Sequence, residues 1–294
     1  MIEGMKFGRF SLPKEPYAFV IIEGNSHFQI DEVSSWDQAM QMHLADLRRL
    51  ATTATRRTIT ISQLCAPLAS GTEIWGAGVT YLPSDTETAA MAGSFDVYSK
   101  IYNSARPELF FKGNSFRVAD PGGPIGIRFD ADSSVPEPEI AFVLNRFGEQ
   151  IGLTLCNDVT ARSIEAENPL HLNQAKVYLR SSALGPFVTP IWEVPALETI
   201  FIHGRIVRDD IPIWEDKTSL GRLCRSPEEL VEYLFRCQSF DCGVVLSTGA
   251  GIWPPEQISL ASGDRVEIWA TDLGKLVNDV AVIPMIGEAQ RSTA

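Results

Sequence analysis

The chain has 294 residues, of which 45% are hydrophobic and 21% are charged, and its formal net charge is −12. This composition excludes a long disordered tract, and the length favours one large domain with a smaller partner. Because the acidic excess repels phosphate backbones and acidic membranes, we expect neither nucleic acid nor a membrane as a partner.

The lack of a recognisable targeting signal and the spacing of the cysteines favour a cytoplasmic location. No run of about 18 uncharged apolar residues occurs, and the first residues lack the basic segment and apolar run of a signal peptide. The cysteines are odd in number and have no Cys-x-x-Cys spacing, which is typical of reduced thiols: Cys65, Cys156, Cys224, Cys237 and Cys242. We therefore expect a cytoplasmic protein.

Residues 1–70 are predicted to form a small N-terminal α/β domain. Residues 17–22 have the composition of a strand. A helix follows, which Ser34 or Ser35 can cap, and its apolar side chains recur at helical spacing: Trp36, Met40, Leu44 and Leu47. The resulting apolar stripe is expected to pack against the main domain.

Residues 71–294 are predicted to form a β-rich catalytic domain of the α+β class. Short apolar runs separated by Gly, Pro and Asp are typical of strands, and they lie at residues 140–144, 151–155, 200–202, 243–246 and 266–270. Helices are fewer. Residues 85–103 have loose helical periodicity, and Ser226, Pro227 and Glu229 begin a helix that is expected to reach about Cys237.

Several familiar catalytic motifs are missing from the sequence. It has no Gly-x-x-x-x-Gly-Lys phosphate loop, no Gly-x-Ser-x-Gly elbow and no His-Glu-x-x-His. Gly76-Ala-Gly78 lacks the third glycine of a dinucleotide fingerprint, so a tight turn is predicted there. No histidine lies near a plausible nucleophile, which disfavours a serine or cysteine triad.

Three acidic residues flank two of the predicted strands. Glu137 and Glu139 lead into the run at 140–144, and Asp158 follows the run at 151–155. Residues two apart on an extended chain point to the same side, so the carboxylates of Glu137 and Glu139 are expected to lie together. A site of carboxylates alone suits Mg²⁺ or Mn²⁺. The alternative is that all three are solvated surface acids.

The same region supplies cations to an acidic protein, namely Arg106, Lys112, Arg162 and Lys176. This pattern suits a small anionic ligand. Glu108 and Lys112 flank an apolar patch, where burial would shift their pKa values toward those of catalytic groups. An ordinary ion pair between these two residues is the alternative.

Taken together, these motifs resemble those of the fumarylacetoacetate hydrolase superfamily. The residues that carry the resemblance are the Glu-x-Glu at 137–139, Asn157-Asp158-Val-Thr-Ala-Arg162, Lys176 and Gly185-Pro186. The resemblance covers about residues 72–190 and implies a mixed β roll in which Glu137, Glu139 and Asp158 bind a divalent metal, Mg²⁺ or alternatively Mn²⁺.

A narrower resemblance is to the dehydratases of 2-dehydro-3-deoxy sugar acids in that superfamily. It rests on Trp75-Gly-Ala-Gly-Val, Ala105-Arg-Pro-Glu108-Leu-Phe-Phe-Lys112, Pro136-Glu-Pro-Glu139 and Glu165-Ala-Glu-Asn-Pro-Leu170. The hydrolases carry a lid histidine that activates water, whereas Thr80-Tyr81-Leu-Pro-Ser84 places a serine at that position. This departure favours elimination of water over carbon–carbon hydrolysis.

The resemblance implies that a 2-oxo acid such as 2-dehydro-3-deoxy-D-arabinonate loses water at this metal to give 2-oxoglutarate semialdehyde. Lys176 is the expected base at C3 and Glu108 the expected proton donor to the C4 hydroxyl, although the two roles are exchangeable. Substrate contacts are expected from Thr80, Arg106, Lys112 and Thr248. A homodimer or homotetramer is expected. Rival functions are hydrolysis or decarboxylation of another 2-oxo acid, and sugar-acid binding without catalysis.

Overall fold

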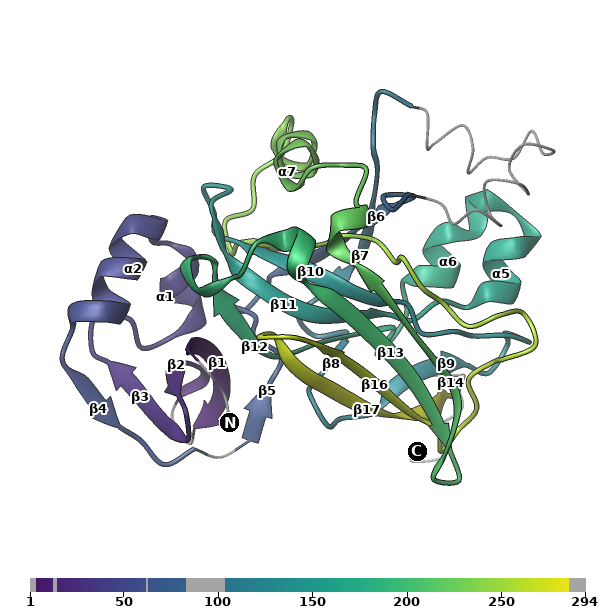
Figure 1. Ribbon diagram of the computed structural model, residues 1–294, viewed down its shortest axis with the longest axis horizontal. Helices are drawn as coiled ribbons and strands as arrows, with labels where there is room; N and C mark the ends of the chain where they lie inside the picture. The colour runs from purple at the N-terminus through teal and green to yellow at the C-terminus, as the bar shows by residue number, and fades with distance from the viewer. Residues whose placement is uncertain (1–3, 13–14, 62, 83–103, 286–294) are drawn as a thin grey trace, which may run out of the picture.

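The computed structural model describes residues 4–12, 15–61, 63–82 and 104–285. Within these ranges the strands form a mixed 12-stranded sheet and a smaller five-stranded sheet (Figure 1). The strands of the large sheet are β1 (Met5–Leu12), β2 (Glu15–Glu23), β3 (Ser26–Ile30), β4 (Arg56–Thr58), β5 (Gln63–Cys65), β6 (Glu73–Gly78), β7 (Glu108–Asn114), β8 (Val118–Ala119), β10 (Pro138–Leu144), β11 (Gln150–Asp158), β12 (Ser182–Pro190) and β15 (Val244–Ser247).

The small sheet has the order β14-β13-β16-β17-β9. Its strands are β9 (Ile125–Arg128), β13 (Phe201–Arg208), β14 (Ile211–Ser219), β16 (Arg265–Ala270) and β17 (Gly274–Ile283). The helices are α1 (Trp36–Met40), α2 (Leu44–Thr53), α5 (Arg162–Glu167), α6 (Leu172–Lys176) and α7 (Pro227–Phe235), with short 3₁₀ turns at Pro169–His171, Ile191–Glu193, Leu197–Thr199 and Leu220–Arg222.

All of the strands predicted from apolar runs are found, as β2, β10, β11, β13, β15 and β16. The predicted helix start at Ser226 is also confirmed, because the Ser226 hydroxyl accepts a hydrogen bond from Glu229 N at the beginning of α7. The helix predicted at 85–103 lies outside the described residues. No helix in the described part of the chain combines the length and apolarity needed to cross a membrane.

The N-terminal strands continue the large sheet instead of forming a sheet of their own. The path runs β4-β3-β2-β1-β12-β11-β10-β15-β6-β7, and β1 pairs with β12 (Figure 1). One buried cluster joins both parts of the chain, with Phe7 and Phe19 packed in the same core as Ala141 and Leu184. Whether residues 1–70 fold as a separate domain stays a prediction.

The single helix predicted around residues 36–47 is wrong, because the structure has two helices there. Ser35 caps α1 as predicted, and Trp36 is fully buried. The chain then leaves the helical path after Met40, whose carbonyl accepts from Arg146 N at 3.1 Å. Glu149 accepts from Leu44 N at 2.8 Å and so holds the start of α2. Long-range hydrogen bonds therefore divide the helix.

Strands β10 and β11 lie in the middle of the large sheet and are buried on both faces. Ile140 and Phe142 of β10 belong to the core shared with the small sheet, whereas Ala141 and Val143 face the N-terminal helices. Acidic side chains are excluded from such a strand interior. They are found at one edge of this region, where Glu137 immediately precedes β10, Glu139 is its second residue and Asp158 ends β11.

The large sheet is rolled, which brings distant strands together. Strand β7 stands at the end of the strand path, three strands beyond β10. Its Lys112 nevertheless donates hydrogen bonds to the carbonyls of Val159, at 2.9 Å, and Lys176, at 2.6 Å. The face of β7 that carries Lys112 therefore meets the end of β11.

Candidate functional site

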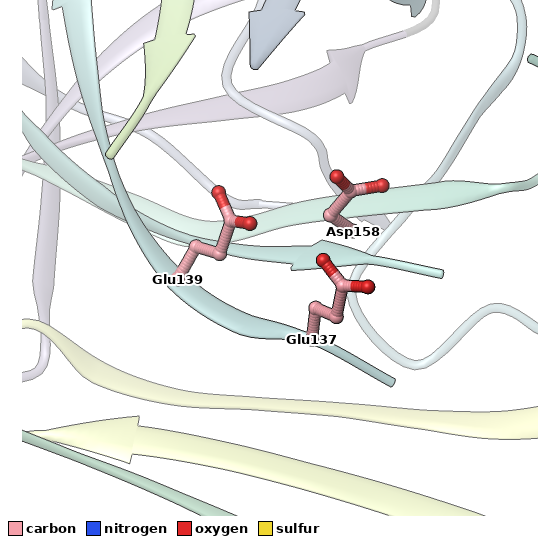
Figure 2. Close-up of side chains that lie close together, drawn as sticks. All are labelled: Glu137, Glu139 and Asp158. Atoms are coloured by element: carbon pink, nitrogen blue, oxygen red, sulfur yellow. The ribbon is translucent and has the colours of Figure 1, made fainter. Parts of the chain in front are cut away.

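Glu137, Glu139 and Asp158 gather where β10 begins and the antiparallel strand β11 ends. One carboxylate oxygen from each lies within 4.8 Å of the others, and Figure 2 shows the three carboxyl groups turned toward a common space. Glu139 is 2% exposed and Asp158 is 1% exposed, so these two are not solvated surface acids. The expected same-side placement of Glu137 and Glu139 is confirmed.

Two lysines neutralise part of this cluster. Lys112 Nζ lies 2.5 Å from Asp158 Oδ1, and Lys176 Nζ lies 3.0 Å from Asp158 Oδ2 and 2.8 Å from Glu137 Oε2. Burial opposes ionisation of Asp158, but the two ammonium groups outweigh it and lower the pKa of Asp158 below its ordinary value. Asp158 is therefore held as a carboxylate.

Glu139 has a different environment from the other two acids. Among the described residues no basic side chain forms an ion pair with it. Glu139 accepts a hydrogen bond from Gly249 N at 3.1 Å, and the Ser247 side chain also hydrogen-bonds to it. Burial, with repulsion from Asp158 and Glu137, holds the pKa of Glu139 well above its ordinary value. A buried set of three carboxylates with this excess of negative charge fits a hard divalent cation.

The ammonium group of Lys112 contacts oxygens of the protein. Its ammonium lies within 2.9 Å of three chain oxygens, Val159 O, Lys176 O and Asp158 Oδ1, and it is 1% exposed. The ion pair considered between Lys112 and Glu108 is not formed, because Lys112 pairs with Asp158. The substrate contact expected of Lys112 stays a prediction. As predicted, burial lowers its pKa, although Asp158 opposes the shift.

Glu108 begins β7, four residues before Lys112. Burial raises its pKa, while the Lys176 charge opposes the rise. The tight turn predicted at Gly76-Ala-Gly78 is wrong, since these residues lie in β6, opposite Phe110 and Glu108 in register. A Cβ atom on Gly78 would collide with Glu108 Oε2. The absence of a side chain at Gly78 therefore makes room for Glu108.

Lys176 ends α6 and lies between Glu137 and Asp158, above the ring of Phe110 at 5.4 Å from its centroid. Burial lowers the pKa of Lys176, but Asp158, Glu137 and Glu165 together outweigh it and raise the pKa well above the ordinary value. Without a bound metal, the surrounding carboxylates therefore keep Lys176 protonated as an ammonium. Its nearness to the carboxylates agrees with the predicted site.

The remaining predicted residues are placed at different depths. Thr80 and Thr248 are both buried, and the Thr80 hydroxyl donates a hydrogen bond to the Thr248 carbonyl. The next residue, Gly249, donates its N–H to Glu139. Arg106 is exposed, and its guanidinium lies over the ring of Tyr233 on α7. The contact of Arg106 is thus with α7 and not with the carboxylates, and its substrate contact stays a prediction.

Three further residues lie beside the site, and the sequence suggested a role only for Arg162, as a cation that suits an anionic ligand. Thr160 donates a hydrogen bond to Glu137 Oε1 at 2.7 Å. Burial raises the pKa of Glu165 on α5, and the charges that act on it include Lys176, Glu137 and Asp158. Arg162 Nη1 is buried and has no hydrogen-bond partner among the described residues. The sequence feature that could have placed them at the site is that all three follow Asp158 closely in the chain.

Comparison with known proteins places this architecture in a family. The family described as “Fumarylacetoacetate (FAA) hydrolase C-terminal” matches residues 73–281. A Haloferax volcanii protein named “Probable 2-keto-3-deoxyxylonate dehydratase” is 40% identical over 211 residues, 72% of this chain and 73% of that protein. A Saccharolobus solfataricus protein named “2-dehydro-3-deoxy-D-arabinonate dehydratase” is 35% identical over 213 residues, 71% of each chain.

The fold is also similar to a solved structure of “2-keto-3-deoxy-D-arabinonate dehydratase complexed with magnesium and 2,5-dioxopentanoate”. The TM-score is 0.78, with 26% identity, and the match covers 96% of this chain and 100% of that one. The predicted β-rich mixed fold is confirmed by this likeness and by the sheets described above. Since the family match spans most of the sequence, the chain belongs to the fumarylacetoacetate hydrolase family.

Proposed function

We propose that the protein is a Mg²⁺-dependent dehydratase of a 2-dehydro-3-deoxy sugar acid, such as 2-dehydro-3-deoxy-D-arabinonate. The product would be 2,5-dioxopentanoate, which is 2-oxoglutarate semialdehyde. The observation that supports it most strongly is the meeting of the three-carboxylate cluster with Lys176, in a chain whose relatives are named dehydratases. One solved relative is described with magnesium and this product.

Glu137, Glu139 and Asp158 would hold the cation, with Mn²⁺ as an alternative to Mg²⁺. A divalent cation bound there withdraws electron density from a 2-oxo group and makes the C3 hydrogens more acidic. Arg162, whose Nη1 is buried without an acceptor, offers a hydrogen-bond donor to an anionic substrate group. Thr248 stays the predicted second contact for the substrate carboxylate.

The chain supplies two groups for proton transfer. Lys176 Nζ would accept a proton from C3, for which it must be the neutral amine, and a further positive charge beside it favours that form. The Glu108 carboxyl would donate its proton to the C4 hydroxyl as the C4–O bond breaks, so that water leaves. The unsaturated alcohol then tautomerises to the aldehyde.

The pH dependence of turnover tests the role of Glu108. Because burial raises the pKa of Glu108, its carboxyl keeps the proton to higher pH than an ordinary glutamic acid. A donor must be protonated, so kcat is expected to fall as the pH rises through this raised pKa. Glu108→Gln should lower kcat by about 10²- to 10⁴-fold and remove that limb of the kcat–pH profile. An unchanged alkaline limb in the variant would contradict the assignment.

Gly78→Ala is expected to disable Glu108 without unfolding the protein. The added methyl group would displace the end of a flexible side chain, so the melting temperature should change little, whereas kcat should fall by at least about tenfold. Gly113→Ala is the matched control, because its Cβ would meet only Arg117 Cβ, at 3.8 Å. Equal activities of the two variants would show that Gly78 does not position Glu108.

The substrate can be identified with a panel of 2-dehydro-3-deoxy acids that differ in chain length and configuration. Each acid is incubated with the purified protein and Mg²⁺, and products are identified by mass spectrometry. Loss of one water supports dehydration, whereas pyruvate or carbon dioxide as product would favour the cleavage or decarboxylation of a 2-oxo acid. Thermal stabilisation by an acid without turnover would instead indicate a binding protein. The oligomeric state and the cytoplasmic location stay predictions.

A further inference from the structure

Each carboxylate of the cluster has one oxygen held by a donor from elsewhere in the chain. Glu137 Oε1 accepts a hydrogen bond from the Thr160 hydroxyl at 2.7 Å. Asp158 Oδ1 lies 2.5 Å from Lys112 Nζ. Glu139 Oε2 accepts from Gly249 N at 3.1 Å. These three contacts come from different segments of the chain, which the rolled sheet brings around the site.

The other oxygens of Glu137 and Asp158 meet one cationic group. Glu137 Oε2 and Asp158 Oδ2 both lie within 3.0 Å of the same cationic group, Lys176 Nζ. In Glu137 and in Asp158, one carboxylate oxygen therefore contacts Thr160 or Lys112, and the second oxygen contacts the Lys176 ammonium. This division fixes the rotation of the carboxyl group, which would otherwise be free about its last torsion.

We propose that Thr160 and Lys112 are positioning groups that each hold one oxygen of a carboxylate, of Glu137 and of Asp158 respectively, and thereby present the other oxygen to the cation. The proposal rests on the proposed metal site. The Thr160 hydroxyl bonds to Glu137 and the Lys112 ammonium pairs with Asp158, so both act through a ligand. Preorganised ligands bind a metal more tightly because less rotational freedom is lost on binding.

Thr160 allows the cleaner test, because valine has nearly the shape of threonine without its hydroxyl. Mn²⁺ affinity is measured on the metal-stripped full chain by electron paramagnetic resonance, with no substrate present. Thr160→Val is expected to raise the Mn²⁺ dissociation constant by about 10- to 100-fold. Thr160→Ser keeps the hydroxyl and should restore the affinity to within about threefold of the unaltered protein.

Thr154→Val is the matched control. Thr154 is a fully buried threonine of β11 whose hydroxyl donates to Phe187 O at 2.9 Å, away from the carboxylate oxygens. It should leave the Mn²⁺ affinity unchanged, and the melting temperatures of the metal-free variants report any general loss of stability. Equal weakening of Mn²⁺ binding by Thr154→Val and Thr160→Val would overturn the positioning role.

The outcomes also separate this proposal from the proposed function. Mn²⁺ binding by Thr160→Val that is as tight as in the unaltered protein would overturn the positioning role alone. Absence of Mn²⁺ binding by the unaltered protein would overturn the metal site itself. Weakened binding in Thr160→Val, with rescue by Thr160→Ser, would support the proposal even if the sugar acids were not turned over.

Discussion

Replacing Glu139 by glutamine is expected to abolish metal-dependent turnover and, at the same time, to stabilise the metal-free protein. Glu139 is a buried acid without an ion-pair partner among the described residues, so its charge is costly to the fold in the absence of a cation. Activity should fall by about a thousandfold or more, since electrophilic activation by a metal is worth several kcal/mol. The melting temperature in EDTA should rise by about 2 to 4 °C.

The sign of the stability effect follows from the raised pKa of Glu139. A group whose pKa is raised in the folded state stabilises the fold at low pH and loses that contribution as the pH rises through the folded value. The gain from Glu139→Gln should therefore be larger at pH 8 than at acidic pH. Glu32→Gln, at an exposed position, is the control. A lowered melting temperature in EDTA, with Mg²⁺ stabilisation retained, would contradict this account of Glu139.

Lys176→Met is expected to separate metal binding from catalysis. The Lys176 ammonium contacts oxygens of Glu137 and Asp158 and thus competes with a cation for them. Its removal should tighten Mn²⁺ binding by about tenfold. Turnover should nevertheless fall by about 10²- to 10⁴-fold, because the proton acceptor is lost. Calorimetric titration with Mn²⁺ and steady-state kinetics check the two effects.

The stability change of Lys176→Met should be opposite to that of Glu139→Gln. Loss of one partner from a buried ion pair destabilises by about 3 to 5 kcal/mol, so the melting temperature in EDTA should fall and Mg²⁺ should restore it. Lys217→Met, at an exposed position, serves as the control. Unchanged Mn²⁺ affinity together with full activity would remove Lys176 from the site.

The metal cluster could be predicted from the sequence because its geometry is local. The spacing of Glu137 and Glu139 places both on one side of a strand, and the antiparallel partner strand ends at Asp158 beside them. The apolar runs at 140–144 and 151–155 fixed where those strands lie. The spacing alone left solvated surface acids as an alternative, and the resemblance of the surrounding motifs to the fumarylacetoacetate hydrolase superfamily favoured a metal site.

The partners of the cluster could not be predicted, because they depend on how the sheet rolls. Lys112 lies 46 residues before Asp158 in the chain numbering, and only the curvature of the sheet brings its ammonium to that carboxylate. The two glycines of β6 have the composition of a turn, and their function as space for Phe110 and Glu108 appears only in the paired strands. Such effects are tertiary, not local.

Product formation from a 2-dehydro-3-deoxypentonate, followed as Mg²⁺ is added back to EDTA-treated protein, tests the central claim most directly. We predict no turnover in EDTA, a rate that saturates with Mg²⁺, and a single product that is 2,5-dioxopentanoate, lighter than the substrate by one water. A turnover rate that neither EDTA nor Mg²⁺ changes would contradict the metal dependence. Formation of pyruvate and glycolaldehyde would contradict dehydration.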